Sequence, residues 1–154
     1  MDLDQRLLLP DEAATGRLAA RIAAVARAGD VILLGGGYGV GKTAFARAFL
    51  RAVTGDPGLV VPSPSFTLVQ AYPLPQGGDV WHYDLWRIGG PEELAELGWE
   101  EVPRGIALVE WPDRLGPLAP PEALRLDLAP VPGRPESRTV TLSGWPDRIA
   151  GLAP

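Results

Sequence analysis

Residues 36–43, with the sequence GGYGVGKT, constrain the fold of this chain more than any other segment. They fit the pattern G-x-x-x-x-G-K-[ST], in which the backbone amides of a glycine-rich loop surround the phosphates of a nucleotide. The loop contains Lys42, which is the only lysine among the 14 lysine and arginine residues of the sequence. Because a compact ammonium fits between the β- and γ-phosphates better than a planar guanidinium does, we predict a nucleotide-phosphate loop here.

The segments on both sides of this loop have the patterns that a phosphate loop requires. Residues 31–34 form a short apolar, β-branched run, which is typical of a buried parallel strand. Residues 43–50 contain good helix formers, and their apolar positions recur at spacings of three and four. A strand, a loop and a helix in this order direct the loop amides and the helix N-terminus toward a phosphate.

The loop residues therefore have expected contacts with a nucleotide. Lys42 is expected to reach the terminal phosphates, and the Thr43 hydroxyl is expected to bind Mg²⁺. The remaining residues are expected to surround the phosphates through their backbone amides: Gly36, Gly37, Tyr38, Gly39, Val40 and Gly41. The alternative interpretation is a plain glycine-rich turn between two core elements.

Turn residues divide the rest of the chain into short elements. Asp11 is placed to cap a helix that continues to about Ala28, and a proline and a glycine bound a short helix at 91–97. Apolar and alternating runs predict a hairpin of strands 65–72 and 80–85, a strand at 106–109, and a terminal antiparallel pair at 124–128 and 138–142. We predict one domain over residues 1–154 with an α/β fold. This is a three-layer sandwich like that of the P-loop NTPases, with a mixed, mainly parallel central sheet and an antiparallel C-terminal strand pair.

Composition excludes several classes of protein. The chain has no cysteine, so neither a disulfide framework nor a thiolate metal site is possible. Its formal net charge of −5 argues against a broad nucleic-acid-binding surface, which needs a basic stripe. The first residues do not have the pattern of a signal peptide, and no stretch is long and apolar enough for a membrane span. We therefore expect a cytoplasmic protein without membrane association.

Two acidic residues stand where strands are expected to end. Glu110 follows the apolar run 106–109, which is the position of a Walker B acid, and Asp84 ends the preceding strand. A phosphate loop needs such carboxylates to hold Mg²⁺ and to orient an attacking water. The alternative for each is a solvated or capping carboxylate. Together with Lys42, these two acids are the candidate catalytic residues.

Three other features are less informative. The loop 63–67 offers three hydroxyls beside a proline and could sense a γ-phosphate, although it could equally be a turn. His82 is the only histidine, and a single histidine in a strand is more often a structural hydrogen-bonding residue than a catalyst. Trp111 follows Glu110 and could pack near a nucleotide, although the five tryptophans are expected mainly in the core.

Four blocks in this order resemble the bacterial TsaE (YjeE) family: the phosphate loop and residues 63–69, 82–87 and 108–112. This family is the ATPase subunit of the machinery that makes threonylcarbamoyladenosine in tRNA. The resemblance also includes residues 9–15 and 91–94 and becomes weak after about Pro120. The phosphate loop alone is unspecific, whereas the ordered set of blocks is highly specific.

The resemblance implies a set of ligands and partners. The cofactors are ATP or ADP with Mg²⁺, and Thr43 and Glu110 are the metal ligands. Asp84 belongs to a switch-like segment needed for hydrolysis, and Ser65 and Thr67 belong to a second switch-like loop that faces the triphosphate. Beside the nucleotide base lie Leu9 and Thr15, with Arg134 as a weaker candidate for nucleotide contact. ATP turnover then drives or resets a complex with the TsaD and TsaB proteins, and tRNA is contacted only through that complex.

The chain departs from the family pattern at three positions. Gly37 stands where the family usually has an acidic residue, which puts in doubt any part that this acid plays in stiffening the loop. The SPT motif ends in Ser65, which keeps the hydroxyl, and the tyrosine before Arg87 is replaced by Trp86.

Two other classes of protein remain possible from the residues. A small-molecule kinase would need a lid with arginines and an acceptor pocket, but Arg104, Arg114 and Arg125 are scattered. A GTPase is excluded because the N-K-x-D element needs a second lysine. A nucleotide-sensing module without turnover would differ from an ATPase only in chemistry, and the two acids Asp84 and Glu110 argue against it.

Overall fold

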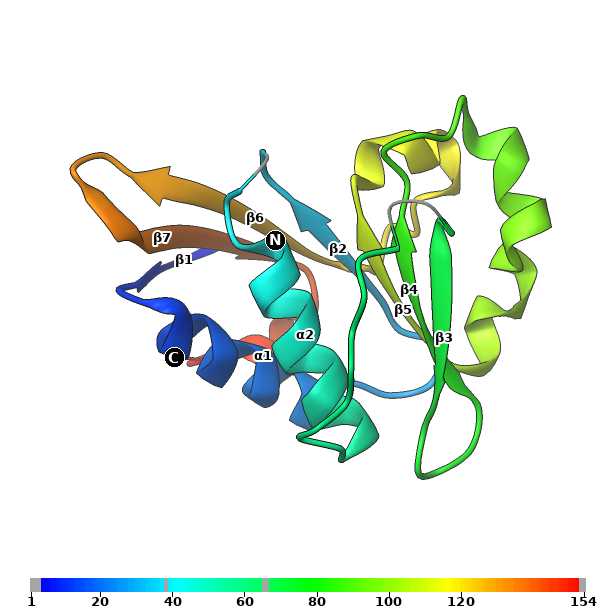
Figure 1. Ribbon diagram of the computed structural model, residues 1–154, viewed down its shortest axis with the longest axis horizontal. Helices are drawn as coiled ribbons and strands as arrows, with labels where there is room; N and C mark the ends of the chain where they lie inside the picture. Colours follow the sequence, from blue (N-terminus) through cyan, green and yellow to red (C-terminus); the bar gives the residue numbers. More distant parts are fainter. Residues whose placement is uncertain (1–3, 38, 65–66, 153–154) are drawn as a thin grey trace.

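The computed structural model describes residues 4–37, 39–64 and 67–152, and the strands of this part form one seven-stranded sheet (Figure 1). The strand order is β1-β7-β6-β2-β5-β4-β3. The strands are β1 Gln5–Leu9, β2 Val31–Gly35, β3 Val69–Pro73, β4 Asp79–Asp84, β5 Ile106–Glu110, β6 Leu124–Val131 and β7 Arg134–Ser143. The helices are α1 Glu12–Val25, α2 Lys42–Thr54 and α3 Pro146–Ile149, with 3₁₀ helices η1 Pro91–Leu97, η2 Trp99–Arg104 and η3 Pro112–Leu118.

The centre of the sheet is parallel and its two sides are antiparallel. Strand β2 pairs in parallel with both β5 and β6, and β4 pairs in parallel with β5. Strands β3, β7 and β1 then add antiparallel pairings at the two sides. Every residue of β2 and β5 is buried, as their continuous apolar sequences predict for strands that are covered on both faces.

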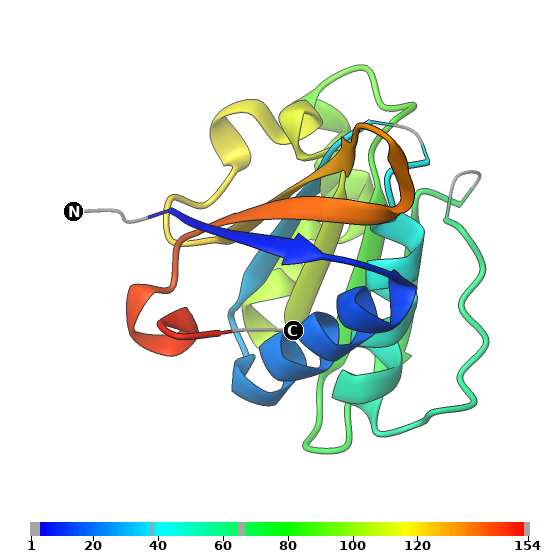
Figure 2. The same cartoon turned by 90° about the vertical axis from the view of Figure 1, so that its left-hand side faces the viewer.

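Helices cover both faces of the sheet and give three layers. On one face α1 and α2 pack side by side, as Figures 1 and 2 show, and they bury Phe45 and Phe49 against Ile32 and Leu108 of the sheet. On the other face the 3₁₀ helices cover the alternate residues of the same strands, including Leu33. The predicted α/β sandwich with a mixed sheet is therefore confirmed. Within the described ranges, no helix combines the length and the hydropathy that crossing a bilayer requires.

The structure differs from the sequence-based elements at several boundaries. Strand β1 was not expected; it pairs with β7 at one side of the sheet. Helix α1 ends at Val25 and not near Ala28, because Ala26 is extended and the Asp30 carboxylate accepts a hydrogen bond from the Arg27 amide. Strand β3 begins at Val69: residues 65–66 of the expected strand lie outside the described residues, and residues 67–68 form a turn because Leu68 has φ +69°. Strands β6 and β7 extend farther toward each other than predicted, to a short turn at Pro132 and Gly133.

Candidate functional site

The carboxyl ends of three neighbouring strands and the N-terminus of one helix lie together at one end of the sheet. Strand β2 leads into the glycine loop and α2, while β4 and β5 end in Asp84 and Glu110, which pair with each other across the two strands. Between these elements lies a cavity of about 460 Å³. Its lining residues are Glu12, Gly39, Gly41, Lys42, Thr43, Ala44, Arg47, Ser63, Asp84, Glu110, Trp111 and Arg138. The structure therefore brings the three candidate catalytic residues and Thr43 to one cavity.

The loop has a backbone shape that its glycines permit. Gly36 has φ +128°, and a Cβ at this position would lie 2.7 Å from the carbonyl oxygen of Leu128. Gly41 has φ +108° and precedes α2 without a side-chain cap for the first turn of the helix. The uncapped amides at the start of α2 are therefore available to an anion in the cavity that Gly41, Lys42 and Thr43 line.

Lys42 lies buried beside the two carboxylates, with 6% of its surface exposed. Its Nζ donates a hydrogen bond to the Gly36 carbonyl over 2.8 Å and lies 3.5 Å from the centre of the Trp111 ring. Burial lowers the pKa of Lys42 from its ordinary value, and the charges of Glu110 and Asp84 oppose this shift. A largely desolvated ammonium of this kind interacts strongly with an incoming phosphate.

Both carboxylates are buried, and each has a fixed partner. Asp84 is 7% exposed, and its Oδ1 accepts a hydrogen bond of 3.0 Å from the Trp86 amide. Glu110 is 6% exposed, and its Oε2 lies 2.7 Å from Nε2 of His82. Burying two acids in this way has a free-energy cost unless a cation shares the space, and Lys42, which lines the same cavity, interacts with both of them.

The oxygen atoms around the cavity fit a magnesium ion that arrives with a nucleotide. The exposed hydroxyl of Thr43 and the carboxylates of Asp84 and Glu110 are hard oxygen ligands. The described residues contain no group of three or more acidic or histidine side chains that could hold a metal by themselves. Mg²⁺ typically takes one or two protein ligands and completes its shell with water and phosphate oxygens, so this donor set suits it.

The residues implied for the base and for the second loop have different surroundings. Thr15 is 4% exposed and lines a smaller cavity of about 60 Å³, which shares Gly41 and Arg138 with the main cavity. Leu9 is fully buried at the end of β1, within the core below α1. Arg134 is exposed at the start of β7 and does not line either cavity.

Two further predictions concern the second loop and the glycine loop. Ser63 lines the main cavity, whereas Thr67 is exposed and its Oγ1 accepts a hydrogen bond of 3.1 Å from Gln70. Tyr38 and Ser65, both predicted to contact the nucleotide, lie outside the described residues.

Arg138 is a site residue that the sequence reasoning missed. Its Nε donates to the carbonyl of Val40 over 2.8 Å, and its Nη2 donates to the carbonyl of Gly39 over 3.3 Å. Its Nη1 also donates to the carbonyls of Pro135 and Ser137, each over 2.7 Å. The side chain thus joins β7 to the glycine loop across 98 positions of sequence. No motif indicated this contact, because it depends on how the sheet places β7.

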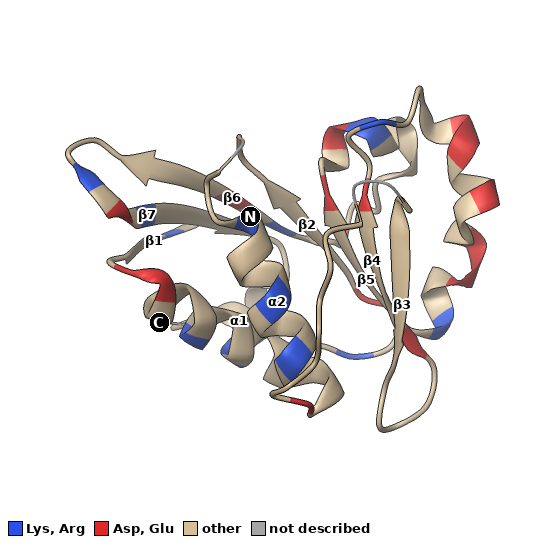
Figure 3. Ribbon diagram, viewed as in Figure 1, with Lys and Arg blue, Asp and Glu red and all other residues tan. Residues whose placement is uncertain are grey.

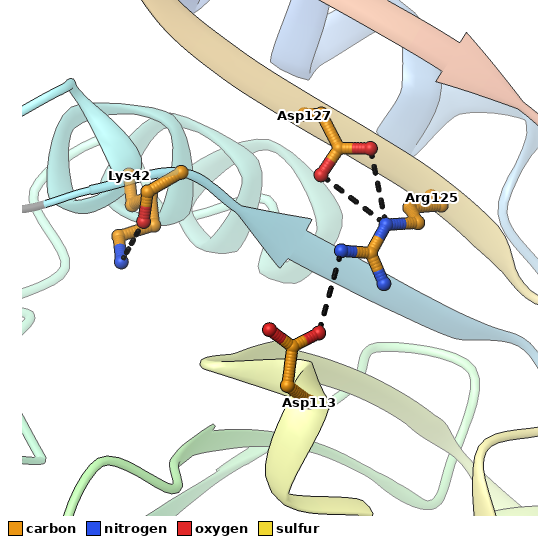
Figure 4. A network of polar contacts seen from close by, with 5 residues as sticks. Lys42, Asp113, Arg125 and Asp127 are labelled. Atoms are coloured by element: carbon orange, nitrogen blue, oxygen red, sulfur yellow. Dashed lines mark hydrogen bonds and ion pairs between the residues drawn. The ribbon is translucent and has the colours of Figure 1, made fainter. Parts of the chain in front are cut away.

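A second polar group lies near the end of β2, on strand β6 and helix η3 (Figure 4). Arg125 donates to Asp127 over 3.0 Å and pairs with Asp113 over 3.6 Å. These side chains are between 38% and 87% exposed, so the pairs contribute less than about 1 kcal/mol to stability. A Cβ on Gly35 would lie 2.2 Å from Oδ1 of Asp127, so this carboxylate explains a glycine directly before the loop.

Charge is unevenly distributed over the molecule (Figure 3). Acidic residues follow one another along η1 and η2, whereas α1 and α2 carry arginines.

At the other end of β2, where this strand begins, a cavity of about 280 Å³ is lined by Trp145 and Arg148. Arg148 is already engaged there, since it pairs with both oxygens of Asp30 over 2.7 and 3.0 Å. The cavity at the glycine loop is therefore the better candidate for anion chemistry.

Comparisons with known proteins give one family. A sequence model of the family described as "Threonylcarbamoyl adenosine biosynthesis protein TsaE" matches residues 9–140. The tRNA threonylcarbamoyladenosine biosynthesis protein TsaE of Rickettsia felis is 36% identical over 123 residues, which cover 79% of this chain and 71% of that protein. The protein of the same name from Aquifex aeolicus is 35% identical, over 74% of this chain and 81% of that protein. The one from Bacillus subtilis is 34% identical, over 80% of this chain and 75% of that protein. The crystal structure of Bacillus subtilis YdiB matches with a TM-score of 0.71 at 25% identity, over 97% of this chain and 91% of that one.

Proposed function

This chain belongs to the TsaE family of threonylcarbamoyladenosine biosynthesis proteins, and from that premise we propose that it binds and hydrolyses Mg²⁺-ATP. Turnover would drive or reset a complex of the TsaD and TsaB proteins, which itself modifies the tRNA. The observation that carries the proposal is the meeting of Lys42, Thr43, Asp84 and Glu110 around one cavity at the start of α2. This set contains a phosphate-binding cation and the oxygen ligands for a metal.

Each part of the cavity has a role in this proposal. The loop amides and the start of α2 hold the phosphates, and Lys42 contacts the terminal ones. Thr43 and Glu110 would hold the magnesium ion, which neutralises charge on the phosphate oxygens when it is bound. Asp84, at the end of the strand next to Glu110, would orient the attacking water. Thr15, in the adjoining small cavity, would lie toward the base.

The geometry favours an ATPase over the two other classes. A kinase needs a second pocket for the phosphate acceptor, and the cavity that adjoins the main one within the described residues measures only about 60 Å³. A sensing module that binds Mg²⁺-triphosphate needs one acid for the metal, whereas Asp84 is a second buried acid next to Glu110, where it could orient a water. The carboxylate pair is therefore the feature that favours hydrolysis.

Turnover is expected to depend on the partner proteins. Gly37, Gly39 and Thr43 are exposed, so the site is not closed against water on that side. We expect slow ATP hydrolysis by the isolated protein and at least about tenfold faster hydrolysis when TsaD and TsaB are added. Release of phosphate is measured with and without the two partners at saturating ATP. Equal rates under both conditions would disprove coupling to these proteins.

Arg138 is expected to affect nucleotide binding through the shape of the loop. The change Arg138→Gln removes the charged donor from the carbonyls of Gly39 and Val40, so the loop loses part of its support. We expect ATP to bind about tenfold more weakly by calorimetry, which corresponds to about 1.4 kcal/mol. The matched control is Arg134→Gln, the same change at the exposed start of the same strand. A loss of affinity in the control alone would show that Arg134 is the nucleotide contact instead.

A further inference from the structure

His82 is a buried polar residue that has no role in the reaction proposed above. It lies in β4 with 2% of its surface exposed. Its Nε2 lies 2.7 Å from Oε2 of Glu110, the proposed metal ligand. The two side chains are 2% and 8% exposed, so the contact is shielded from water.

The register of the sheet explains how the two side chains meet. Asp84 pairs with Glu110 across β4 and β5, and His82 pairs with Leu108. Side chains alternate along a strand, so His82 points to the same face as Asp84, two residues later. The imidazole therefore reaches diagonally to Glu110, over a separation that a long side chain spans.

The hydrogen bond fixes the form of the imidazole. A carboxylate can only accept, so Nε2 of His82 carries the hydrogen and donates it to Glu110. The other ring nitrogen, Nδ1, is buried without a hydrogen-bond partner among the described residues. Among the described residues, Glu110 is therefore the hydrogen-bond partner of the ring, and the buried apolar residues Val80 and Leu108 stand at neighbouring positions of β4 and β5. An apolar residue would avoid the unpaired Nδ1 but would leave the buried Oε2 of Glu110 without its donor, so the role of the histidine lies in its hydrogen bond to Glu110.

We infer that His82 is a positioning residue for the metal. Its Nε2–H holds Oε2 of Glu110, and this orients Oε1 toward the magnesium ion of the bound nucleotide in the cavity that Glu110 and Thr43 line. Residues that donate a hydrogen bond to a metal ligand fix the orientation of that ligand and raise the affinity of the site for the metal. The inference rests on the proposed function, because it needs a Mg²⁺-nucleotide in the cavity.

The test measures how much magnesium strengthens nucleotide binding. A non-hydrolysable ATP analogue is titrated into the protein by calorimetry, once with EDTA and once with excess Mg²⁺, and the ratio of the two Kd values is the magnesium gain. We expect His82→Leu to reduce this gain about tenfold or more while the Kd in EDTA stays within about twofold. His82→Gln is expected to keep most of the gain, because its amide can donate to the same oxygen.

Control variants separate positioning from a structural role. Val80→Ala changes a fully buried residue on the same face of β4, and it should lower the thermal midpoint without changing the magnesium gain. If His82→Leu does not fold, His82→Asn replaces it, since the shorter amide lies near the Nδ1 position and should lose the gain that His82→Gln keeps. An unchanged gain in the leucine or asparagine variant, or an equal loss of affinity with and without Mg²⁺, would overturn the inference. A wild-type protein with no magnesium gain would overturn the proposed function as well.

Discussion

Replacing Lys42 by alanine is expected to remove ATP turnover and to weaken ATP binding by about 100-fold or more. The ammonium lies at the cavity with Asp84 and Glu110, where burial has removed most of its water. A phosphate that displaces the carbonyl of Gly36 gains a charge-assisted contact in a shielded site, and alanine offers no replacement. The measurement is ATP affinity by calorimetry together with phosphate release in the presence of TsaD and TsaB.

The same change should leave the fold intact. The removal relieves the desolvation cost of a buried charge, which offsets part of the cost of losing the Gly36 and Trp111 contacts and of leaving Asp84 and Glu110 without this cation. We expect a thermal midpoint within about 3 °C of the wild type. The control Arg51→Ala removes a positive charge from the same helix outside the cavity and should bind ATP normally. ATP binding by the Lys42 variant at wild-type strength would contradict the assignment of the loop.

Replacing Glu110 by glutamine is expected to lower partner-stimulated turnover by about 100-fold or more. Glutamine has the size of glutamate and can still accept the hydrogen bond of His82, so the local packing is kept. It lacks the negative charge that a magnesium ion needs, so metal-dependent chemistry should fail while nucleotide without metal still binds. Phosphate release at saturating Mg²⁺-ATP measures the effect.

Asp127→Asn provides the matched control for this change. It removes one carboxylate from the middle of β6, opposite the end of β2, but Asp127 does not line the cavity and pairs with Arg125 on the protein surface. Turnover of this variant should stay within about twofold of the wild type, as for most substitutions of exposed ion pairs. Equal losses in the two variants would mean that turnover responds to charge at this edge of the sheet and not to a metal ligand.

Much of the fold and the core of the site followed from local patterns. The apolar run 31–34, the glycines and the helix formers after Thr43 predicted β2, the loop and α2, and the structure has them in this order. Glu110 and Asp84 were predicted at strand ends, and parallel pairing of β4 with β5 places them opposite each other. The resemblance to the TsaE family is confirmed by the match over residues 9–140.

The missed features depend on contacts between distant segments. Strand β1 is a five-residue edge strand, and its hydrogen bonds come from β7 at the other end of the chain. Arg138 reaches the glycine loop only because β7 adds to the sheet beside β6. The ring of Trp111 meets Lys42 because its backbone has φ +57°, which few residues other than glycine adopt and which no local pattern indicated.

The sequence contained part of the information that predicts the contact of His82 with Glu110. The spacing of His82 and Asp84 already put both side chains on one face of a strand. The contact with Glu110 additionally needs the neighbour and the register of β5, which the pairing in the folded sheet supplies. The prediction that the single histidine forms a structural hydrogen bond was therefore right, but the sequence did not indicate that Glu110 is the partner.

The most direct measurement of the central claim follows the γ-phosphate of labelled ATP in a mixture of this protein, TsaD, TsaB and Mg²⁺. We expect the label to appear as inorganic phosphate, at a rate that falls when Mg²⁺ is removed. Label that stays in bound ATP would show a nucleotide-sensing module, and label on another small molecule would show a kinase; either result would contradict the ATPase.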